Sequence, residues 1–239
     1  MQASVLHSMR SLTEVIREAA RIGLAPTRRN VLHWLSWAIT FTAILVLSAV
    51  AGSGIFGWEK DLTRELQSVG YPNWAFEITS SRLEDPTSWQ GALIWAAAIA
   101  LLALWRLRLE AALATLALPL HVLGNFPKAF VDRERPSELF DGITGVGGDM
   151  SFTSGHAEFA ITFFGFLVYV AIIRLKSAVP RICLLFAWLL FVALVGFGRI
   201  TDGHHWPLDL LGGYVVGIGL LSGLVWLRTS FHKALSDAE

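Results

Sequence analysis

The chain has 239 residues, of which 54% are hydrophobic and 16% are charged, and its 19 basic and 19 acidic residues give a formal net charge of zero. Soluble domains usually carry about 25% charged residues, so these side chains are too few to cover a water-facing surface of this size. The composition predicts a membrane protein, and the zero net charge excludes a strongly basic nucleic-acid binder. The single cysteine, Cys183, excludes an internal disulfide and a cysteine-based zinc cluster, and we expect it to be a buried small side chain.

Six apolar stretches come close to the roughly 20 residues that a helix needs to cross a bilayer. They are residues 31–56, 89–105, 109–126, 157–173, 182–197 and 208–227. The first of them is too long for the apolar part of a cleaved signal peptide, so we do not expect one. The sequence predicts an all-α, polytopic membrane protein: six transmembrane helices in one domain at residues 31–228, a cytoplasmic amphipathic and basic segment at residues 1–30, and a cytoplasmic tail at residues 229–239.

Lysine and arginine residues gather in four segments outside these stretches, at residues 1–30, 106–108, 174–181 and 228–239. Cytoplasmic loops of membrane proteins keep an excess of these residues. We therefore expect both termini on the cytoplasmic side. The remaining loops, at residues 57–88, 127–155 and 198–207, then face the opposite compartment.

Two segments outside the stretches have an amphipathic pattern. In the first outer loop Trp58, Leu62, Leu66 and Val69 recur at approximately helical spacing, which predicts a short helix at the interface. Packing over the bundle is its favoured role, with lipid guidance as the alternative. Residues 4–24 are amphipathic and basic, as expected for attachment to an anionic leaflet.

Polar residues form three clusters in the two later outer loops and at the adjoining helix ends. The first runs from Lys128 to Arg135-Pro136, the second is Thr153-Ser154-Gly155-His156, and the third runs from Gly198-Arg199 through His205 to Asp209. The charge bias places all three at the same membrane face. We therefore expect them to meet.

Five residues from the three clusters are suited to binding a phosphate. Lys128, Arg135 and Arg199 supply three positive charges, and guanidinium groups match the oxygens of phosphate. Ser154 and Gly155 directly precede the fourth apolar stretch, where free N–H groups and the helix dipole favour an anion. Together they predict a pocket for a phosphoryl group and for the charge of its transition state.

Two histidines supply the expected chemistry. His205 precedes the sixth helix, whose first turn contains Pro207 and Asp209. The Asp209 carboxylate is placed to hold one ring nitrogen of His205, leaving the other to attack phosphorus. His156 is placed to protonate the leaving oxygen. His204 competes for the nucleophile role; composition does not separate the two, and the spacing to Asp209 favours His205.

Other polar residues have simpler interpretations. We expect Arg133 to be solvated and Glu158 to neutralise local charge or complement the helix dipole. Four histidines have no expected role: His7, His33, His121 and His232. The loop acids lack a tight metal-ligand spacing, so no metal or cofactor is predicted: Asp132, Glu134, Asp141 and Asp149.

The three clusters resemble the motifs of the type 2 phosphatidic acid phosphatase (PAP2) superfamily, K-x6-R-P, P-S-G-H and S-R-x5-H-x3-D. Thr153 and Gly198 depart from the Pro and Ser of that pattern. The resemblance implies that His205 is the nucleophile, oriented by Asp209, and that His156 is the general acid. It implies metal-independent chemistry and a phosphate held by five residues: Lys128, Arg135, Ser154, Gly155 and Arg199.

The predicted function is hydrolysis of a phosphorylated lipid at the outer face of a bacterial-type inner membrane, through a phosphohistidine. Candidate substrates are undecaprenyl pyrophosphate, phosphatidylglycerol phosphate, phosphatidic acid and the phosphates of lipid A. Two alternatives stay open, a lipid phosphotransferase using the same intermediate and a non-catalytic protein that binds or transports lipids. No nucleic-acid partner is expected.

Overall fold

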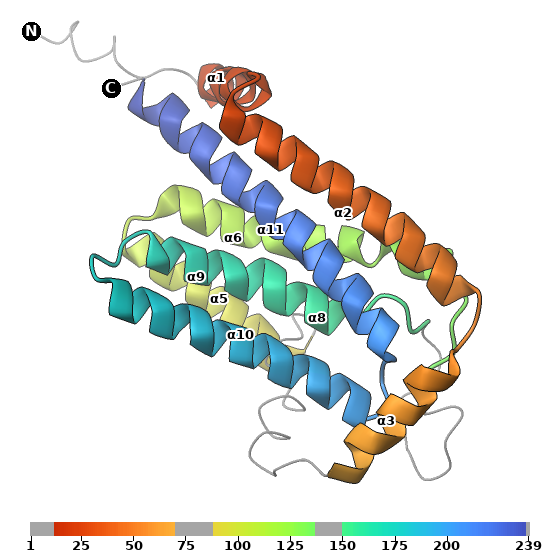
Figure 1. The fold of residues 1–239 in the computed structure, drawn as a ribbon. Helices are drawn as coiled ribbons and strands as arrows, with labels where there is room; N and C mark the ends of the chain where they lie inside the picture. Colours follow the sequence, from red (N-terminus) through yellow and green to blue (C-terminus); the bar gives the residue numbers. More distant parts are fainter. Residues whose placement is uncertain (1–11, 70–87, 137–149, 238–239) are drawn as a thin grey trace, which may run out of the picture.

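The computed structural model describes residues 12–69, 88–136 and 150–237, and all of its regular elements are helices (Figure 1). The prediction of an all-α protein is confirmed. In chain order the helices are α1 (Leu12–Leu24), α2 (Arg28–Gly52), α3 (Gly57–Val69), α5 (Trp89–Leu104), α6 (Arg108–Gly124), the 3-10 turn η1 (Phe126–Ala129), α8 (Gly155–Phe159), the π-helical η2 (Ala160–Phe164), α9 (Gly165–Ile172), α10 (Ala178–Thr201) and α11 (Pro207–Ser236).

Each of the six apolar stretches forms a helix, and α8, η2 and α9 follow one another directly. Within the described residues, five helical segments are long and apolar enough to cross a membrane: Arg28–Gly52, Arg108–Ala129, Gly155–Ile172, Ala178–Thr201 and Pro207–Ser236. The sixth, Trp89–Leu104, has 16 residues, about 24 Å of helix against a hydrocarbon core of about 30 Å. The chain is a multi-pass membrane protein, and α11 continues without a break past residue 228, the expected limit of the membrane domain.

The outward faces of α2 and α10 are apolar. Leu32, Ile39 and Phe41 of α2 and Ile182 and Phe186 of α10 are all more than half exposed. Soluble proteins rarely expose apolar patches of this extent, so these faces are the lipid-contacting ones. Cys183 is also exposed. The expectation that it is buried was wrong, because an apolar stretch of a membrane helix turns part of its surface to lipid.

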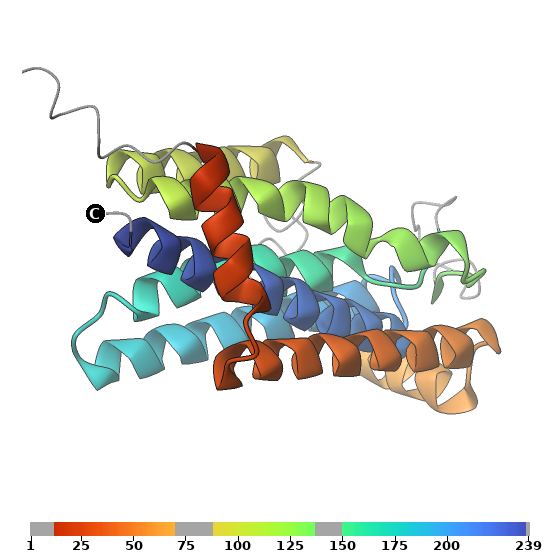
Figure 2. The same cartoon turned by 90° about the horizontal axis from the view of Figure 1, so that it is seen from above.

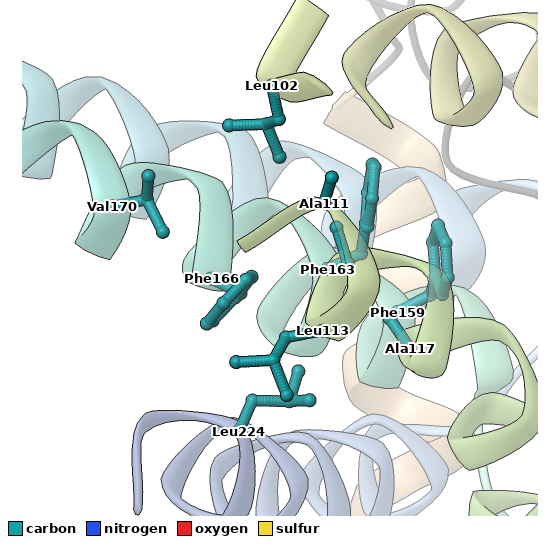
Figure 3. Packing of buried hydrophobic residues seen from close by; sticks show 10 residues of the cluster. Leu102, Ala111, Leu113, Ala117, Phe159, Phe163, Phe166, Val170 and Leu224 are labelled. Atoms are coloured by element: carbon teal, nitrogen blue, oxygen red, sulfur yellow. The ribbon is translucent and has the colours of Figure 1, made fainter. Parts of the chain in front are cut away.

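Helix α11 occupies the middle of the bundle, between α2 on one side and α5 and α6 on the other (Figure 2). The principal core lies between α5, α6, α11 and the consecutive segments α8, η2 and α9. Phe166 lies near Leu113 and Leu224, and Phe159 lies beside Ala117 (Figure 3). This core holds α8 and α11 against each other. Both helices begin at the same end of the bundle.

Helix α1 lies across the ends of α2 and α11 (Figure 2). Val15, Ala19 and Ile22 are buried against Ala234 of α11, whereas Leu12 and Ile16 are exposed. This confirms an amphipathic helix in the amino-terminal segment; residues 4–11 of the predicted one lie outside the described residues. The described parts of the four segments rich in lysine and arginine, residues 12–30, 106–108, 174–181 and 228–237, lie at this end of the bundle, away from α3 (Figure 1).

The helix predicted in the first outer loop is α3, which lies at the opposite end beside α10 and α11 (Figure 1). Leu66 packs in a small cluster with Ala157, Ile200 and Leu210. The favoured role of packing over the bundle is therefore confirmed for this helix. The three polar clusters lie at the same end of the bundle as α3.

Candidate active site

The third cluster runs from the end of α10, through the loop at residues 202–206, into the first turn of α11, and this loop has a defined geometry at both ends. Helix α10 stops at a Schellman motif, in which the N–H of Gly203 donates to Ile200 O at 3.0 Å and the N–H of His204 donates to Arg199 O at 3.0 Å. Gly203 has a φ of 70°, which glycine adopts without a Cβ penalty. The N–H of His205 also donates to Arg199 O, at 3.0 Å. Arg199 and His205 are thereby held close together.

Helix α11 begins immediately after this loop. Pro207 is its first residue, and the Asp209 carboxylate accepts from the N–H of Trp206 at 2.7 Å, half of a capping box. The position predicted for Pro207 is confirmed. A helix stop, a five-residue loop and a capped start thus explain the spacing from Arg199 to His205 and Asp209.

The second cluster lies directly against the start of α11. Ser154 is the N-cap of α8, and its backbone N–H donates to Asp209 O at 3.0 Å. Gly213 permits this approach, because a Cβ there would lie 2.4 Å from Ser154 O. Ser154 and Gly155 therefore open a helix beside Asp209, as the sequence predicts.

The first cluster reaches the same place from α6. Lys128 lies in η1, and both Lys128 and Arg135 lie near enough to His205 for their charges to act on it. Arg135 is 9% exposed and donates from Nη1 to His204 O at 3.1 Å. The predicted convergence of the three clusters is confirmed.

His156 follows Gly155 in α8 and completes this grouping. Its neighbours in electrostatic terms are Arg199, His205, His204 and His121. Arg199 is 4% exposed and lies 3.7 Å from the carboxylate of Asp202. The imidazoles of His156 and His205 therefore share one largely buried region at the α3 end of the bundle with three cationic side chains, Lys128, Arg135 and Arg199.

The tautomer of His205 is set by a backbone carbonyl. Nδ1 of His205 lies 2.9 Å from Ser151 O, so Nδ1 carries the proton and Nε2 keeps its lone pair. Asp209 Oδ2 is 3.7 Å from Nδ1, beyond hydrogen-bond distance. The Asp209 carboxylate was expected to hold this ring nitrogen; it lies within ion-pair distance of Nδ1, while Ser151 O accepts the hydrogen bond.

Burial lowers the pKa of His205 to about 4, and the Asp209 carboxylate acts in the opposite direction. The cationic side chains Arg135 and Lys128 lower it further. A positive imidazolium is disfavoured in a site that is already cationic and shielded from water. The ring is therefore neutral at pH 7, as a nucleophile requires.

Arg133 is buried, so the expectation that it is solvated was wrong. It is 2% exposed, and Nη1 donates to Asp209 Oδ1 at 2.6 Å while Nη2 donates to Glu59 Oε2 at 2.5 Å. The Ser151 hydroxyl donates to the other oxygen of Asp209. Asp209 is thus surrounded by donors from three parts of the chain, and its orientation is fixed.

His121, for which no role was expected, lies beside the second cluster. It is 9% exposed, and Nδ1 lies 2.5 Å from Glu158 Oε2, whose second oxygen accepts from Thr162 Oγ1 at 2.6 Å. A Cβ on Gly155 would lie 3.1 Å from His121 Cε1. His121 therefore forms part of the wall behind the second cluster. Of the remaining histidines, His33 contacts Ser222, His232 is exposed and His7 lies outside the described residues.

The family model described as the PAP2 superfamily matches residues 107–233 of the chain, more than half of its length. The chain belongs to the PAP2 superfamily.

Two curated relatives match over shorter segments. Lipid phosphate phosphatase 2 of Arabidopsis thaliana is 35% identical over 77 residues, which are 30% of this chain and 26% of that protein. A PA-phosphatase related-family protein of Dictyostelium discoideum is 34% identical over 91 residues, 36% of this chain and 24% of that protein. The chain thus spans about a quarter of the length of these relatives. The transmembrane PAP2 type phosphatidylglycerolphosphate phosphatase from Bacillus subtilis aligns over 91% of this chain and 95% of its own, at 17% identity and a TM-score of 0.42.

The chain departs from the PAP2 motif pattern at two buried positions. Thr153 is fully buried and packs at α11, where a Cβ on Gly212 would lie 2.8 Å from its Cγ2. Gly198 is buried within α10 and accepts the hydroxyl of Thr201 at 3.1 Å through its carbonyl. Both departures are therefore at positions shielded from solvent.

Sequence reasoning missed the polar residues that support the PAP2 motifs. Ser151, Arg133 and Glu59 contact Asp209 or its partners, and the spacing of the motifs gives no signal for Ser151 or Glu59. Arg133 stands two residues before Arg135, but its buried partners lie 74 and 76 positions away in the chain. Of the loop acids, Asp132 and Glu134 are exposed, and Asp141 and Asp149 lie outside the described residues. The described residues contain no group of three or more acidic, His or Cys side chains that would hold a metal ion.

Proposed function

We propose that this PAP2 protein is a membrane-embedded phosphatase that hydrolyses the phosphate monoester or pyrophosphate of a lipid through a phosphohistidine. The observation that carries the proposal is the position of His205. It presents a neutral ring with Nδ1 bound to Ser151 O, beside three cationic side chains and the start of α8.

The phosphate is held by charge and by a helix terminus. Lys128, Arg135 and Arg199 neutralise the phosphoryl oxygens, while Ser154 and Gly155 supply the N-terminal end of α8. These groups strengthen their contacts as the transferring phosphoryl group spreads charge over its oxygens. No metal has a role in this scheme.

The reaction proceeds in two displacements. The negative charge of the bound phosphate offsets the cationic side chains and allows His156 to carry a proton before the reaction. Nε2 of His205 attacks phosphorus, the bond between phosphorus and the leaving oxygen breaks, and His156 gives that oxygen its proton. His156 then takes a proton from water, whose oxygen attacks the phosphohistidine. The P–N bond breaks, inorganic phosphate leaves and His205 returns to its neutral form. Asp209 keeps the ring oriented through both steps.

The site faces the outer side of the inner membrane in this proposal, and both termini are cytoplasmic. The clustering of lysine and arginine at the α1 end of the bundle supports this orientation. The substrate is a phosphorylated lipid that reaches the site from the bilayer. The candidates are undecaprenyl pyrophosphate, phosphatidylglycerol phosphate, phosphatidic acid and lipid A phosphates.

The test is a panel of these four lipids in detergent micelles, with and without EDTA, assayed for released phosphate. We expect turnover of at least one lipid in EDTA, its loss in His205→Ala, and its retention in the neighbouring control His204→Ala. Turnover by His205→Ala at the wild-type rate contradicts the mechanism. Turnover abolished by EDTA contradicts metal independence, and phosphate recovered on an acceptor lipid instead of in solution identifies a phosphotransferase.

A further inference from the structure

Helix α3 contacts both ends of the α10–α11 loop that carries His205. At the amino-terminal end of α3, Glu59 Oε1 accepts from the N–H of Leu208 in the first turn of α11 at 3.2 Å. Near its other end, Gln67 Nε2 donates to Thr201 O, the last residue of α10, at 3.4 Å. The loop of residues 202–206 lies between these two contacts along the chain. One helix outside the membrane-spanning set is therefore bonded to both of its flanks.

The contact at Glu59 is built for rigidity. Its side chain is fully buried, and Oε2 accepts both Arg133 Nη2 at 2.5 Å and the N–H of Phe56 at 3.2 Å. A carboxylate is rarely buried unless it is paired, and here both oxygens have donors. These contacts fix the Glu59 side chain in one position. A carboxylate on the exposed face of the same helix has no such constraint.

The same carboxylate reaches the nucleophile through two further side chains. Arg133 bridges Glu59 and Asp209, and Asp209 binds the hydroxyl of Ser151. The Ser151 carbonyl in turn accepts a hydrogen bond from Nδ1–H of His205 at 2.9 Å. The backbone N–H of Ser151 donates to Arg133 O at 2.8 Å. A continuous set of buried polar contacts therefore runs from α3 to the imidazole. Removal of one buried charge leaves its partner uncompensated.

We propose that α3 holds the His205 loop in its reactive position, and that Glu59 is a positioning residue for the nucleophile. This inference rests on the proposed function for the meaning of the His205 position, and it assigns to an amphipathic outer helix a direct part in ordering the site. Glu59 touches no reacting atom. It acts on the α11 N-terminus through Leu208 and on Asp209 through Arg133.

The test compares Glu59→Gln with Glu65→Gln, because Glu65 is an exposed carboxylate on the same helix. Gln67→Ala serves as a second variant that removes the other contact without touching the buried charges. Amide hydrogen exchange of residues 202–208, hydrolysis of phosphatidic acid in micelles and the melting temperature are measured for each full-length protein.

In Glu59→Gln we expect the amide exchange rates of residues 202–208 to rise about tenfold relative to the wild type, while those of α5 and α6 stay unchanged. We expect kcat to fall about 10- to 100-fold, with KM changed less than about threefold, because misplacement of the nucleophile affects the reaction step. Gln67→Ala shows the same pattern to a smaller extent, and Glu65→Gln resembles the wild type.

Two results would overturn the inference. The first is a Glu59→Gln protein whose loop exchange and kcat match those of Glu65→Gln. The second is a rise in exchange spread equally over α5, α6 and the loop, which means that Glu59 supports the whole fold and not the loop. If the wild-type protein hydrolyses none of the four lipids, the proposed function fails, while the exchange measurements still decide whether α3 orders the loop.

Discussion

Nδ1 of His205 lies 2.9 Å from the carbonyl oxygen of Ser151, closer than the 3.7 Å that separates it from the carboxylate of Asp209. Asp209 binds the hydroxyl of Ser151, so the carboxylate orients the imidazole largely through this serine. The backbone carbonyl sets the tautomer, and the carboxylate supplies negative charge nearby. Two different groups therefore perform the two tasks that the sequence assigned to Asp209 alone.

This division predicts unequal effects at the two positions. Ser151→Ala removes the hydroxyl but keeps the carbonyl, so we expect the loss of one hydrogen bond to a charged group, about 1.5 kcal/mol or about tenfold in kcat. Asp209→Asn disturbs the contacts of Ser151, Arg133 and Trp206 together, and we expect about a 100-fold loss of kcat. Steady-state kinetics measures both, and equal losses would contradict the division.

The pH dependence of the reaction reports on His205. Its pKa lies at about 4 because of burial, and Nε2 attacks phosphorus only in the neutral form. On the acid side, activity is therefore lost as the pH falls through about 4 and His205 becomes protonated. The measurement is kcat/KM against pH with p-nitrophenyl phosphate, corrected for the second ionisation of the substrate phosphate at about pH 6.

Asp209→Asn provides the control for this assignment. The carboxylate raises the pKa of His205, so its removal moves the acid inflection to lower pH in the residual activity. An inflection near the ordinary histidine value of about 6.5 in the wild type, or one that does not move in Asp209→Asn, argues against His205 as the group that titrates.

Arg133 pairs two buried carboxylates, and its replacement tests their dependence on it. Arg133→Met leaves Glu59 and Asp209 buried without their shared cation, and we expect a loss of about 3–5 kcal/mol in the free energy of unfolding. Thermal denaturation in detergent measures it. In Arg64→Met, which removes an exposed ion pair with Asp61, we expect no resolvable change.

A double replacement separates charge from packing at this site. Adding Glu59→Gln to Arg133→Met removes one of the two uncompensated charges, and we expect part of the lost stability to return. If the double variant is less stable than Arg133→Met by the full effect of Glu59→Gln alone, the two residues do not interact as the structure indicates.

The close approach of α8 and α11 depends on a glycine. Gly213→Ala would place a Cβ 2.4 Å from Ser154 O, and since both atoms belong to backbone-anchored groups, the two helices must move apart. We expect at least about a tenfold loss of kcat, because Ser154 moves relative to Asp209. In Gly52→Ala, where a Cβ meets nothing within 4 Å, we expect wild-type activity.

Much of the site was predictable because local chemistry determines it. Pro207 at a helix start, Ser154 before a helix and the short separation of His205 from Asp209 are features of helix ends, and helix-end patterns extend over only a few residues. The gathering of lysine and arginine then placed the three clusters at one face. That inference needed no knowledge of side-chain packing.

The failures concern burial, which depends on residues far away in the sequence. The sequence indicates a solvated loop residue at Arg133, but the fold brings Glu59 and Asp209 beside it. It gives no signal for His121, which lies 2.5 Å from Glu158 in the structure. Cys183 was expected to be buried and is exposed. Its neighbours in the sequence are apolar, but in a membrane helix apolar residues also face lipid. In each case the environment of the side chain was set by another element.

The central claim is that His205 forms a covalent bond to phosphorus, and rapid acid-free quenching of a turnover reaction tests it most directly. With a lipid labelled in its phosphate, we predict that the label appears on the peptide that contains His205, is lost in acid, and is absent in His205→Ala. Full turnover with no label on the protein at any quench time, or label on His204 instead, would contradict the account.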